Sequence, residues 1–340
     1  MKSITLVARD MGGSEALGLL AEYLGSVGWQ THTFLGYGKQ IASLNDLQGA
    51  VEGSDITLCG MSSSPELAAP ELTAFDLAKA TGKKFGFFAD IFNSHRRTWL
   101  QDQLRQADVF FVLNEDEAAK ARQHLPGVNV VVTGNPVWER FAFPKFTATE
   151  IRSQLGLNDG RVLLVVGTKE LLINIALVSA VLNLVHRHNW HCQIVYSFHP
   201  GDRNPVALYE PLVAWSGGKI QLVLPETMAG TDIVPAADVI VDSFSTIGIQ
   251  AGFLRKPVVT YASGLALGRL KVITGQEMWE PIEQGYVMSG RNDEELQRAL
   301  LSVFSGNSGL RQKQEAMFLI PTELGRSVGL LAAELERLVP

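Results

Sequence analysis

Short apolar runs alternate with segments of helical period along the whole chain. The runs are rich in Val, Ile, Phe and Thr, and most are continuously apolar, which is typical of parallel strands covered on both faces. The segments between them have helical spacing: residues 15–27 carry an apolar stripe at Ala16, Leu20, Tyr23, Leu24 and Val27. The expected strands are residues 3–8, 30–35, 55–60, 84–89, 108–113, 129–133, 161–166, 192–198, 219–224, 238–241 and 257–261.

Strands that alternate with helices predict right-handed crossovers and doubly wound α/β sheets. The alternation pauses once, over residues 139–150, which have neither period and contain Pro144. We therefore predict two Rossmann-like, doubly wound domains that face a cleft. They cover residues 1–145 and 146–320.

A last helix is expected within residues 321–340. Thr322 is its expected N-cap, and its apolar stripe consists of Leu324, Val328, Leu331, Leu335 and Leu338. We predict that this C-terminal helix closes the fold by packing across the domain junction.

Composition and charge exclude several classes of protein. The chain is 46% hydrophobic and 19% charged with a net charge of −6, and no basic stripe indicates nucleic acid as a partner. Cys59 and Cys192 lie far apart in apolar runs, as small buried residues of a reducing cytoplasm do. The most apolar run, residues 171–185, is shorter than the roughly 20 residues of a transmembrane helix, and the N-terminus lacks a signal peptide. We predict a cytoplasmic protein with no transmembrane segment.

Ligands of open α/β sheets bind beyond the carboxyl ends of the strands, so these ends contain the candidate site residues. The first strand is followed by Gly12, Gly13 and Ser14, which could approach an acceptor, and by Glu15, a candidate base or a residue that only favours the helix dipole. The GxGxxG fingerprint is absent, and the second strand ends in FLGYG without a carboxylate. Both features argue against a nicotinamide dehydrogenase.

The loop after the fourth expected strand is dense in polar groups. It contains Asp90, Asn93, His95, Arg96 and Arg97. Such a loop could hold a general base, Asp90, and bind an acceptor through Asn93 and His95. A solvated start of a helix explains the same residues equally well.

In the second half, the first strand is followed by Thr168 and Lys169 before a helix, which suits a phosphate although no P-loop motif is present. The next strand ends at His199, just before Pro200, where an imidazole could donate to a phosphate or polarise a leaving group. The third strand leads to Thr227, in a loop whose backbone could contact a base.

The stretch 235–261 contains the most informative loop of the chain. A β-branched run ends in Ser243, Ser245 and Thr246, and an amphipathic segment with Gln250 follows. A strand, a loop of hydroxyls and a helix start favour binding of an anion such as a nucleotide phosphate. No metal-ligand motif and no GxSxG elbow is present, so we expect neither a metal nor serine-hydrolase chemistry.

Several motifs together resemble the sugar-nucleotide enzymes of the GT-B fold. Residues 132–137 (VTGNPV) resemble the TGNP segment that ends the N-terminal domain of UDP-N-acetylglucosamine 2-epimerases and related transferases. His199 and Pro200 with residues 203–205 are similar to the histidine-proline segment of these epimerases. Residues 242–259 match their nucleotide-binding strand, loop and helix. The resemblance covers nearly the whole chain in order.

The chain departs from these epimerases at functional positions. Ala251 and Gly252 stand where the epimerases carry two glutamates, and residues 90–93 replace a catalytic Glu-Ala-Gly-Leu-Arg segment. The His-Pro pair with a Ser-x-Ser/Thr cluster resembles CMP-sialic acid and CMP-Kdo transferases, and CDP-glycerol phosphotransferases carry similar elements. In that comparison His199 contacts the donor phosphate, and the hydroxyl cluster holds phosphate or leaving group.

These features favour a metal-independent, inverting glycosyltransferase that binds a nucleotide-sugar donor and an acceptor of unknown identity. A UDP-N-acetylglucosamine 2-epimerase-like or hydrolysing enzyme and a catalytically silent nucleotide-sugar-binding protein are the alternatives. The sequence does not identify the donor or the acceptor. It also leaves the oligomeric state open, and a homodimer is one possibility. The candidate catalytic residues are Asp90, Glu15 and His199. The candidate donor-binding residues are Thr168, Lys169, His199, Thr227, Ser243, Ser245, Thr246 and Gln250. The candidate acceptor-binding residues are Gly12, Gly13, Ser14, Asn93 and His95.

Overall fold

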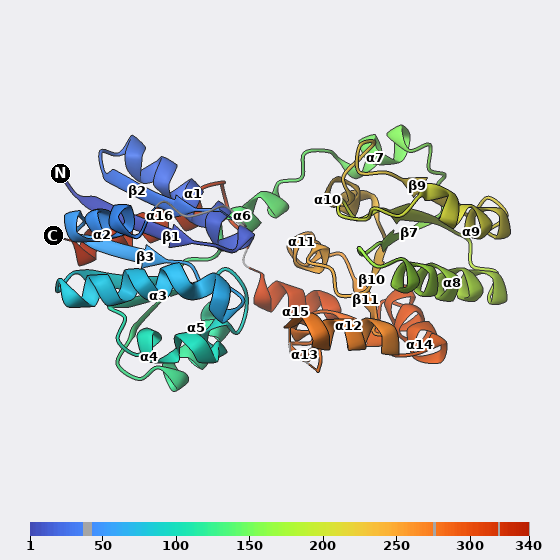
Figure 1. Cartoon of the computed structure of the whole chain (residues 1–340). Helices are drawn as coiled ribbons and strands as arrows, with labels where there is room; N and C mark the ends of the chain where they lie inside the picture. The colour runs from blue at the N-terminus through green and yellow to red at the C-terminus, as the bar shows by residue number, and fades with distance from the viewer. Residues whose placement is uncertain (37–42, 275–276, 319, 340) are drawn as a thin grey trace. The chain divides into compact units, whose positions relative to one another are not determined.

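A computed structural model describes residues 1–36, 43–274, 277–318 and 320–339. Tyr37 and Gly38, at the end of the FLGYG segment, lie outside the described residues. The chain forms two compact units. Unit 1 consists of Met1–Arg140 and Ile320–Pro340, and unit 2 of Phe141–Leu319. Each unit is a parallel sheet flanked by helices (Figure 1).

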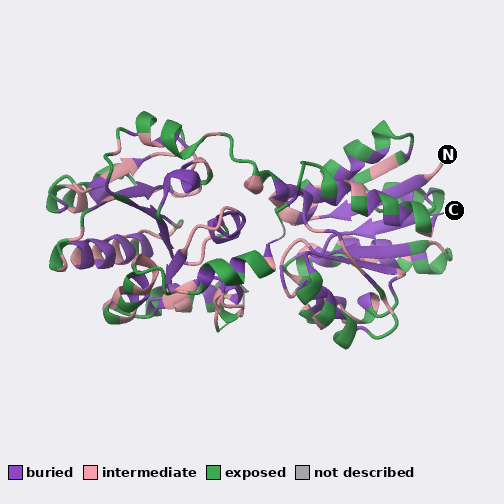
Figure 2. Ribbon diagram, turned by 180° about the vertical axis from the view of Figure 1, so that it is seen from behind, coloured by how far each residue is buried: buried purple, intermediate pink, exposed green. Residues whose placement is uncertain are grey.

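The sheet of unit 1 is parallel throughout and has the strand order β2-β1-β3-β4-β5-β6. Apart from Lys84, every residue of β1, β3, β4 and β5 is buried, as the apolar runs predicted (Figure 2). The strands are β1 (Ser3–Ala8), β2 (Gln30–Leu35), β3 (Ile56–Cys59), β4 (Lys84–Phe88), β5 (Val109–Val112) and β6 (Asn129–Val132).

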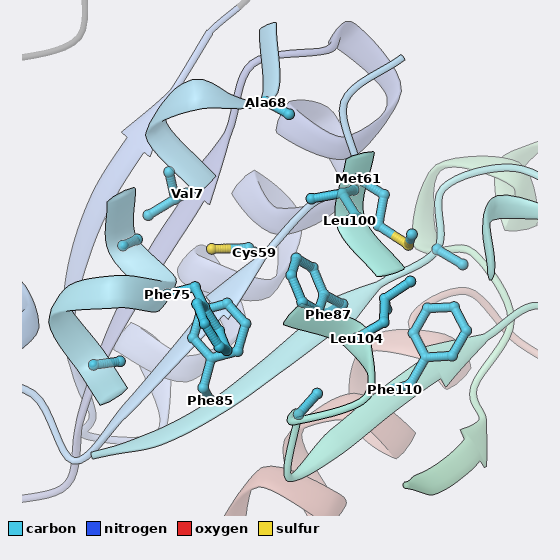
Figure 3. Close-up of a cluster of buried hydrophobic side chains, with 14 of the residues drawn as sticks. Val7, Cys59, Met61, Ala68, Phe75, Phe85, Phe87, Leu100, Leu104 and Phe110 are labelled. Carbon is cyan, nitrogen blue, oxygen red and sulfur yellow. The ribbon is translucent and has the colours of Figure 1, made fainter. Parts of the chain in front are cut away.

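Helices cover both faces of this sheet. On one face α1, α6 and α16 pack on Leu6 and Leu58, and on the other α3 packs on Phe85 and Phe87. Figure 3 shows this second cluster, in which the rings of Phe75 and Phe85 meet edge to face at 5.1 Å. The helices are α1 (Met11–Ser26), α2 (Leu44–Gly53), α3 (Pro65–Ala80), α4 (Gln101–Leu104), α5 (Glu115–His124), α6 (Pro136–Glu139) and α16 (Arg326–Leu338), with 3-10 turns η1 (Ser94–Arg96) and η2 (Thr98–Leu100).

The C-terminal helix α16 belongs to the core of unit 1. It packs on α1 and α6, and its buried residues include Leu331 and Leu335. The prediction of Thr322 as its N-cap is wrong, because the helix begins after Gly325, whose φ of 90° favours glycine. Glu139 caps the helix instead. The expectation that the helix bridges the two domains stays a prediction.

The sheet of unit 2 is also parallel, in the order β12-β11-β10-β7-β8-β9. Its edge strand β12 was not predicted, because only three residues form it. The other strands occur where the apolar runs placed them, within one or two residues. They are β7 (Arg161–Val166), β8 (Cys192–Ser197), β9 (Ile220–Val223), β10 (Val239–Asp242), β11 (Val258–Tyr261) and β12 (Met288–Gly290).

The apolar run 171–185 forms most of α8, which packs with α14 on one face of this sheet. No helix among the described residues is long and apolar enough to span a membrane. Cys59 and Cys192 are both buried and unpaired. The helices are α7 (Ala148–Gln154), α8 (Leu171–Arg187), α9 (Glu210–Trp215), α10 (Gly230–Ile233), α11 (Ile247–Phe253), α12 (Gly264–Thr274), α13 (Glu280–Glu283), α14 (Asp293–Phe304) and α15 (Leu310–Met317), with 3-10 turns η4 (Val206–Tyr209) and η5 (Val234–Ala236).

The segment 139–150 is more ordered than its sequence indicated. A 3-10 turn, η3 (Arg140–Ala142), follows α6, and α7 already begins at Ala148. Thr147 and Glu150 form a capping box at the start of α7. The T-x-x-E pattern therefore marks the start of α7 in the sequence. It was missed because the segment has no longer helical period.

The carboxylate of Glu139 accepts hydrogen bonds from the backbone N–H groups of Gly325 (2.8 Å) and Ser327 (2.6 Å). Glu139 is buried, so its neutral variant Glu139→Gln leaves at least one of these donors poorly satisfied. We expect the local opening of α16 to become easier by about 1–2 kcal/mol. Hydrogen exchange of residues 326–338 should then be about 5- to 30-fold faster.

The matched control is Glu323→Gln, at an exposed position just before α16. It should leave the exchange of α16 unchanged. Equal exchange rates in the two variants would show that Glu139 does not hold the helix.

Candidate functional site

Unit 2 has a topological switch point between β7 and β10. The chain leaves β7 toward its neighbour β8, whereas β10 pairs with the other side of β7. At such a point the loops after the two strands diverge and leave room for a ligand. The loops after β7, β8 and β10 contain Lys169, His199 and residues 243–246, so all three end at the same edge of the sheet.

Lys169 and His199 lie close together at this edge. A Cβ atom added to Gly201 would lie 2.8 Å from Lys169 Cε and 3.2 Å from His199 Nδ1, so glycine allows their close approach. Burial lowers the pKa of His199, and the Lys169 ammonium lowers it further. Nδ1 accepts the N–H of Gly201 at 2.8 Å, so the neutral ring carries its proton on Nε2. A cation and a hydrogen-bond donor together suit a phosphate group.

Asn174 ties the loops of Lys169 and His199 together. It is fully buried in the first turn of α8, and its side-chain oxygen accepts the N–H (2.7 Å) and the hydroxyl (2.9 Å) of Thr168. Its amide nitrogen donates to Asp202 (3.2 Å), which also accepts the hydroxyl of Tyr209 (2.9 Å). The hydroxyl of Thr168, predicted to bind the donor, thus holds the loop in shape.

Sequence reasoning did not find Asn174. The signal was a polar residue on the buried side of an otherwise apolar helix, where an unpaired amide would be costly.

A buried carboxylate, Asp242, shapes the hydroxyl-rich loop after β10. It accepts the hydroxyl of Thr260 (2.5 Å) and the N–H of Ser245 (3.1 Å). Burial raises the pKa of Asp242 to about 7, and these hydrogen bonds act in the opposite direction. Phe244, the residue before Ser245 in this loop, has a φ of 65°, a left-handed conformation that is costly for a side chain of this size.

The three predicted hydroxyls of this loop have different roles. Ser243 donates to the carbonyl of Tyr261 (3.0 Å), so its proton is used within the fold. The Ser245 oxygen accepts the N–H of Ile247 (3.3 Å), and Thr246 is exposed. The helix that follows, α11, is only seven residues long, so the side chains and amides of the loop matter more than a helix dipole.

Two other predicted donor-binding residues lie farther along the same edge. Thr227 is exposed in the loop after β9, and its N–H bonds to the carbonyl of Leu224 (3.0 Å). Gln250 is buried, and its side-chain amide donates to the carbonyl of Thr231 (2.6 Å). Gln250 thereby joins α10 to α11, the helix that follows the hydroxyl-rich loop.

The positions of the two missing glutamates are closed by packing. Ala251 is fully buried, and a Cβ atom added to Gly252 would overlap the ring of Phe318. That ring packs against Phe253 at 5.1 Å and Tyr286 at 5.0 Å. A glutamate at 252 would therefore need this aromatic cluster to move. The packing in the core of unit 2 thus disfavours a carboxylate at this position.

Unit 1 has its own switch point, between β1 and β3. Asp90 follows β4 and reaches the start of α1: its Oδ2 lies 2.9 Å from where a Cβ of Gly12 would be, and it bonds to the N–H of Gly13. Its side chain is 11% exposed, and its Oδ1 lies 3.6 Å from Arg97 Nη1. Burial raises the pKa of Asp90, and Arg97 opposes the rise. Asp90, Gly12 and Gly13 are thus brought together, as predicted for one site.

A second buried carboxyl, Glu71 of α3, lies near this group and was not predicted. It is fully buried and accepts the hydroxyl of Ser62 at 2.6 Å. Burial raises the pKa of Glu71 to about 8, with smaller effects from Asp10 and Arg97. Asp10 itself accepts the N–H of Ser63 at 2.7 Å. The signal was a glutamate among the buried positions of an amphipathic helix.

Ser14 and Glu15 have other partners. The Ser14 hydroxyl donates to the carbonyl of Ala8 (2.9 Å) and accepts the N–H of Gly36 (3.1 Å), so it joins the ends of β1 and β2. Glu15 is 47% exposed and lies 3.5 Å from Arg140 in an ion pair. A solvated, paired carboxylate is a weaker candidate for the base than the buried Asp90.

Asn93 and His95 lie in the turn that follows Asp90. Asn93 has a φ of 54°, and its N–H donates to Glu117 at 2.5 Å. His95 is 2% exposed, with its Nδ1 3.8 Å from Glu117. Burial lowers the pKa of His95 to about 4, so the ring is neutral near pH 7. The backbone of Asn93 thus helps to hold the loop that carries Arg97, and acceptor binding by Asn93 and His95 stays a prediction.

The part of the chain that the structure describes contains no cluster of three or more His, Cys, Asp or Glu residues that could hold a metal ion. Two of the carboxylates of unit 1, Asp90 and Glu15, form ion pairs with arginines instead.

The full length of the chain is similar to several solved structures. The UDP complex of MnaA from S. aureus superposes with a TM-score of 0.64 at 15% identity, covering 100% of this chain and 98% of that chain. The Neisseria meningitidis UDP-GlcNAc 2-epimerase bound to UDP-GlcNAc gives 0.62 at 13%, covering 99% and 100%. A glycosyltransferase from Rickettsia africae gives 0.59 at 15%, covering 99% and 98%. No family model matches the chain, and no curated protein matches it.

These similarities define the class of protein. The chain has the GT-B fold, with two Rossmann-like units, that UDP-GlcNAc 2-epimerases share with glycosyltransferases. The predicted fold class is confirmed, and the resemblance to these enzymes is confirmed at the level of the fold. At these identities, the similarity concerns the fold alone.

Glu71 allows a test by pH. Because its pKa in the folded protein is about 8 and the ordinary value is 4.5, folding takes up a proton between these values. The stability of unit 1 should therefore fall as the pH rises across this window. In Glu71→Gln, which has no such proton to lose, the fall between pH 5.5 and pH 8 should be smaller by more than about 1 kcal/mol. Urea unfolding at both pH values measures it.

Glu66→Gln, at an exposed position on the same helix, is the control and should keep the original pH dependence. If Glu71→Gln and Glu66→Gln show the same pH dependence, Glu71 is ionised in the folded protein at neutral pH and the assignment fails.

Proposed function

We propose that the protein is a metal-independent, inverting glycosyltransferase that moves a sugar from a nucleotide-activated donor to an acceptor hydroxyl. Unit 2 holds the donor, and unit 1 binds the acceptor and supplies the base. Two proteins of the same fold were solved with UDP and with UDP-GlcNAc, which supports a nucleotide sugar as the donor.

The closed packing at Ala251 and Gly252 is the observation that carries the proposal. Epimerisation by elimination and re-addition needs several placed carboxylates, and the resembling epimerases have two glutamates at these positions. Here Ala251 is fully buried and the ring of Phe318 fills the space beside Gly252. A direct displacement needs only a base for the acceptor and positive charge for the leaving group, so this loss is compatible with transfer.

On the donor side, Lys169 and the Nε2–H of His199 stabilise the phosphate of the departing nucleotide. Both are preorganised, since Asn174 fixes the loop of Lys169 and Gly201 fixes the His199 ring. Fixed donors of this kind stabilise developing negative charge without reorganising during the reaction.

On the acceptor side, the carboxylate of Asp90 accepts the proton of the acceptor hydroxyl. Burial raises the pKa of Asp90 and so strengthens it as a base, while the Arg97 guanidinium favours its ionised form. The alkoxide oxygen attacks the anomeric carbon, and the bond from this carbon to the nucleotide's phosphate oxygen breaks, leaving its electron pair on that oxygen. Inversion at the anomeric carbon follows from a single displacement.

An epimerase-like enzyme is the second candidate. The full-length similarity to UDP-GlcNAc 2-epimerases favours it, and so do Glu71 and Asp10, which add carboxyl groups near Asp90.

The two candidates differ in their products. The protein is incubated with UDP-, GDP-, CMP- and CDP-sugars, with and without a panel of hydroxyl acceptors, and the released nucleotide is measured. We expect release only in the presence of an acceptor. An epimerised nucleotide sugar, or nucleotide released without an acceptor, would contradict the transferase and support the epimerase-like or hydrolysing enzyme.

Variants assign the roles for the donor that shows turnover. Lys169→Ala should weaken binding of its nucleotide about tenfold or more, because a charge-assisted hydrogen bond is lost. Asp90→Asn should lower kcat about 100-fold and leave nucleotide binding unchanged. Lys313→Ala, at an exposed position of α15, is the control and should change neither quantity. Normal nucleotide affinity in Lys169→Ala would remove Lys169 from the donor site.

A further inference from the structure

We propose that unit 1 takes an uncharged acceptor, such as a neutral glycoside, and holds the reacting hydroxyl between Asp90 Oδ1 and Arg97 Nη1. The inference rests on the proposed transfer to a hydroxyl and names the class of acceptor.

The two atoms form an ion pair but no hydrogen bond. They lie 3.6 Å apart, beyond hydrogen-bond distance, although both are buried. Neither has a hydrogen-bond partner within the described part of the chain. Buried polar atoms in proteins nearly always have hydrogen-bond partners, so two facing atoms without such partners indicate a group that the protein receives from outside.

The chemistry of the pair selects the group. A carboxylate oxygen only accepts and a guanidinium nitrogen only donates, whereas a hydroxyl can donate to the first and accept from the second at the same time. A phosphate or carboxylate would face the negative charge of Asp90 at close range. An ammonium group would face the positive charge of Arg97. A hydroxyl avoids both repulsions.

The surrounding charges also favour a neutral ligand. Arg9 and Asp10, which follow β1, have formal charges that cancel as those of Arg97 and Asp90 do. Glu71 is fully buried, and its raised pKa of about 8 keeps it mostly neutral at pH 7. These five residues therefore have little net charge with which to attract an anionic acceptor.

The position of Asp90 depends on glycine. Its Oδ2 lies 2.9 Å from where a Cβ of Gly12 would be, and the N–H of Gly13 bonds to the carboxylate. The other oxygen, Oδ1, faces Arg97 Nη1. During the reaction the hydroxyl proton passes to Oδ1, and Arg97 stabilises the negative charge that develops on the oxygen.

Binding of acceptors can be measured without a donor. Saturation-transfer NMR uses a panel of neutral methyl glycosides, with glucose 6-phosphate and glucuronic acid as their anionic counterparts. We expect at least one neutral glycoside to bind, and the anionic sugars to bind at least about tenfold more weakly. Stronger binding of the anionic sugars, or no binding of any neutral glycoside, would overturn the inference.

The variants test the two contacts. Arg97→Gln should weaken binding of the neutral glycoside about tenfold, and Arg97→Lys, which retains charge and donors, should restore part of it. Arg105→Gln, at an exposed position of unit 1, is the control and should bind as the original protein does. Unchanged binding in a folded Arg97→Gln, verified by circular dichroism, would remove Arg97 from the site.

The outcomes separate this inference from the proposed function. Arg97-dependent binding of neutral glycosides with no turnover of any nucleotide sugar would keep the acceptor site and reject the transferase. Transfer only to phosphorylated or carboxylated sugars would keep the transferase and reject the neutral acceptor.

Discussion

Parallel pairing is the constraint on which the rest of this structure depends. Because every strand in both sheets runs in the same direction, all the loops that follow the strands meet at one edge of their sheet. In each sheet the chain adds strands first on one side of a central strand and then on its other side. The loops diverge at this switch point, which lies between β7 and β10 in unit 2 and between β1 and β3 in unit 1, and they leave room there for a ligand. Lys169, His199 and Asp90 are placed by this topology rather than by their neighbours in sequence.

Much of the polar chemistry at these edges holds the loops rather than a ligand. Asn174 and Asp242 are buried, and each bonds to the backbone of a loop at the edge, while the buried Gln250 bonds to the backbone of α10. Such hydrogen bonds fix the positions of the groups that remain, chiefly Lys169 and the Nε2 side of His199. A preorganised site of this kind can stabilise a phosphate without first ordering its own loops.

Sequence patterns predicted the strands well because continuous apolar runs report directly on burial in a parallel sheet. They failed where an element depends on distant partners: the start of α16 needs Glu139, and β12 is defined by its pairing with β11. The candidate site shows the same limit. Strand ends indicated Asp90 and His199, whereas Asn174 lies inside a helix and its role appears only when the loops after β7 and β8 meet around it.

The central claim is that unit 2 binds a nucleotide phosphate at the ends of β7, β8 and β10. Titration of UDP into the ¹⁵N-labelled protein tests it most directly, with the backbone amides as reporters. The account predicts that the largest shift changes occur at Thr168, Lys169, Gly201 and residues 243–246. Shift changes confined to unit 1, or to the opposite edge of the unit 2 sheet, would contradict it.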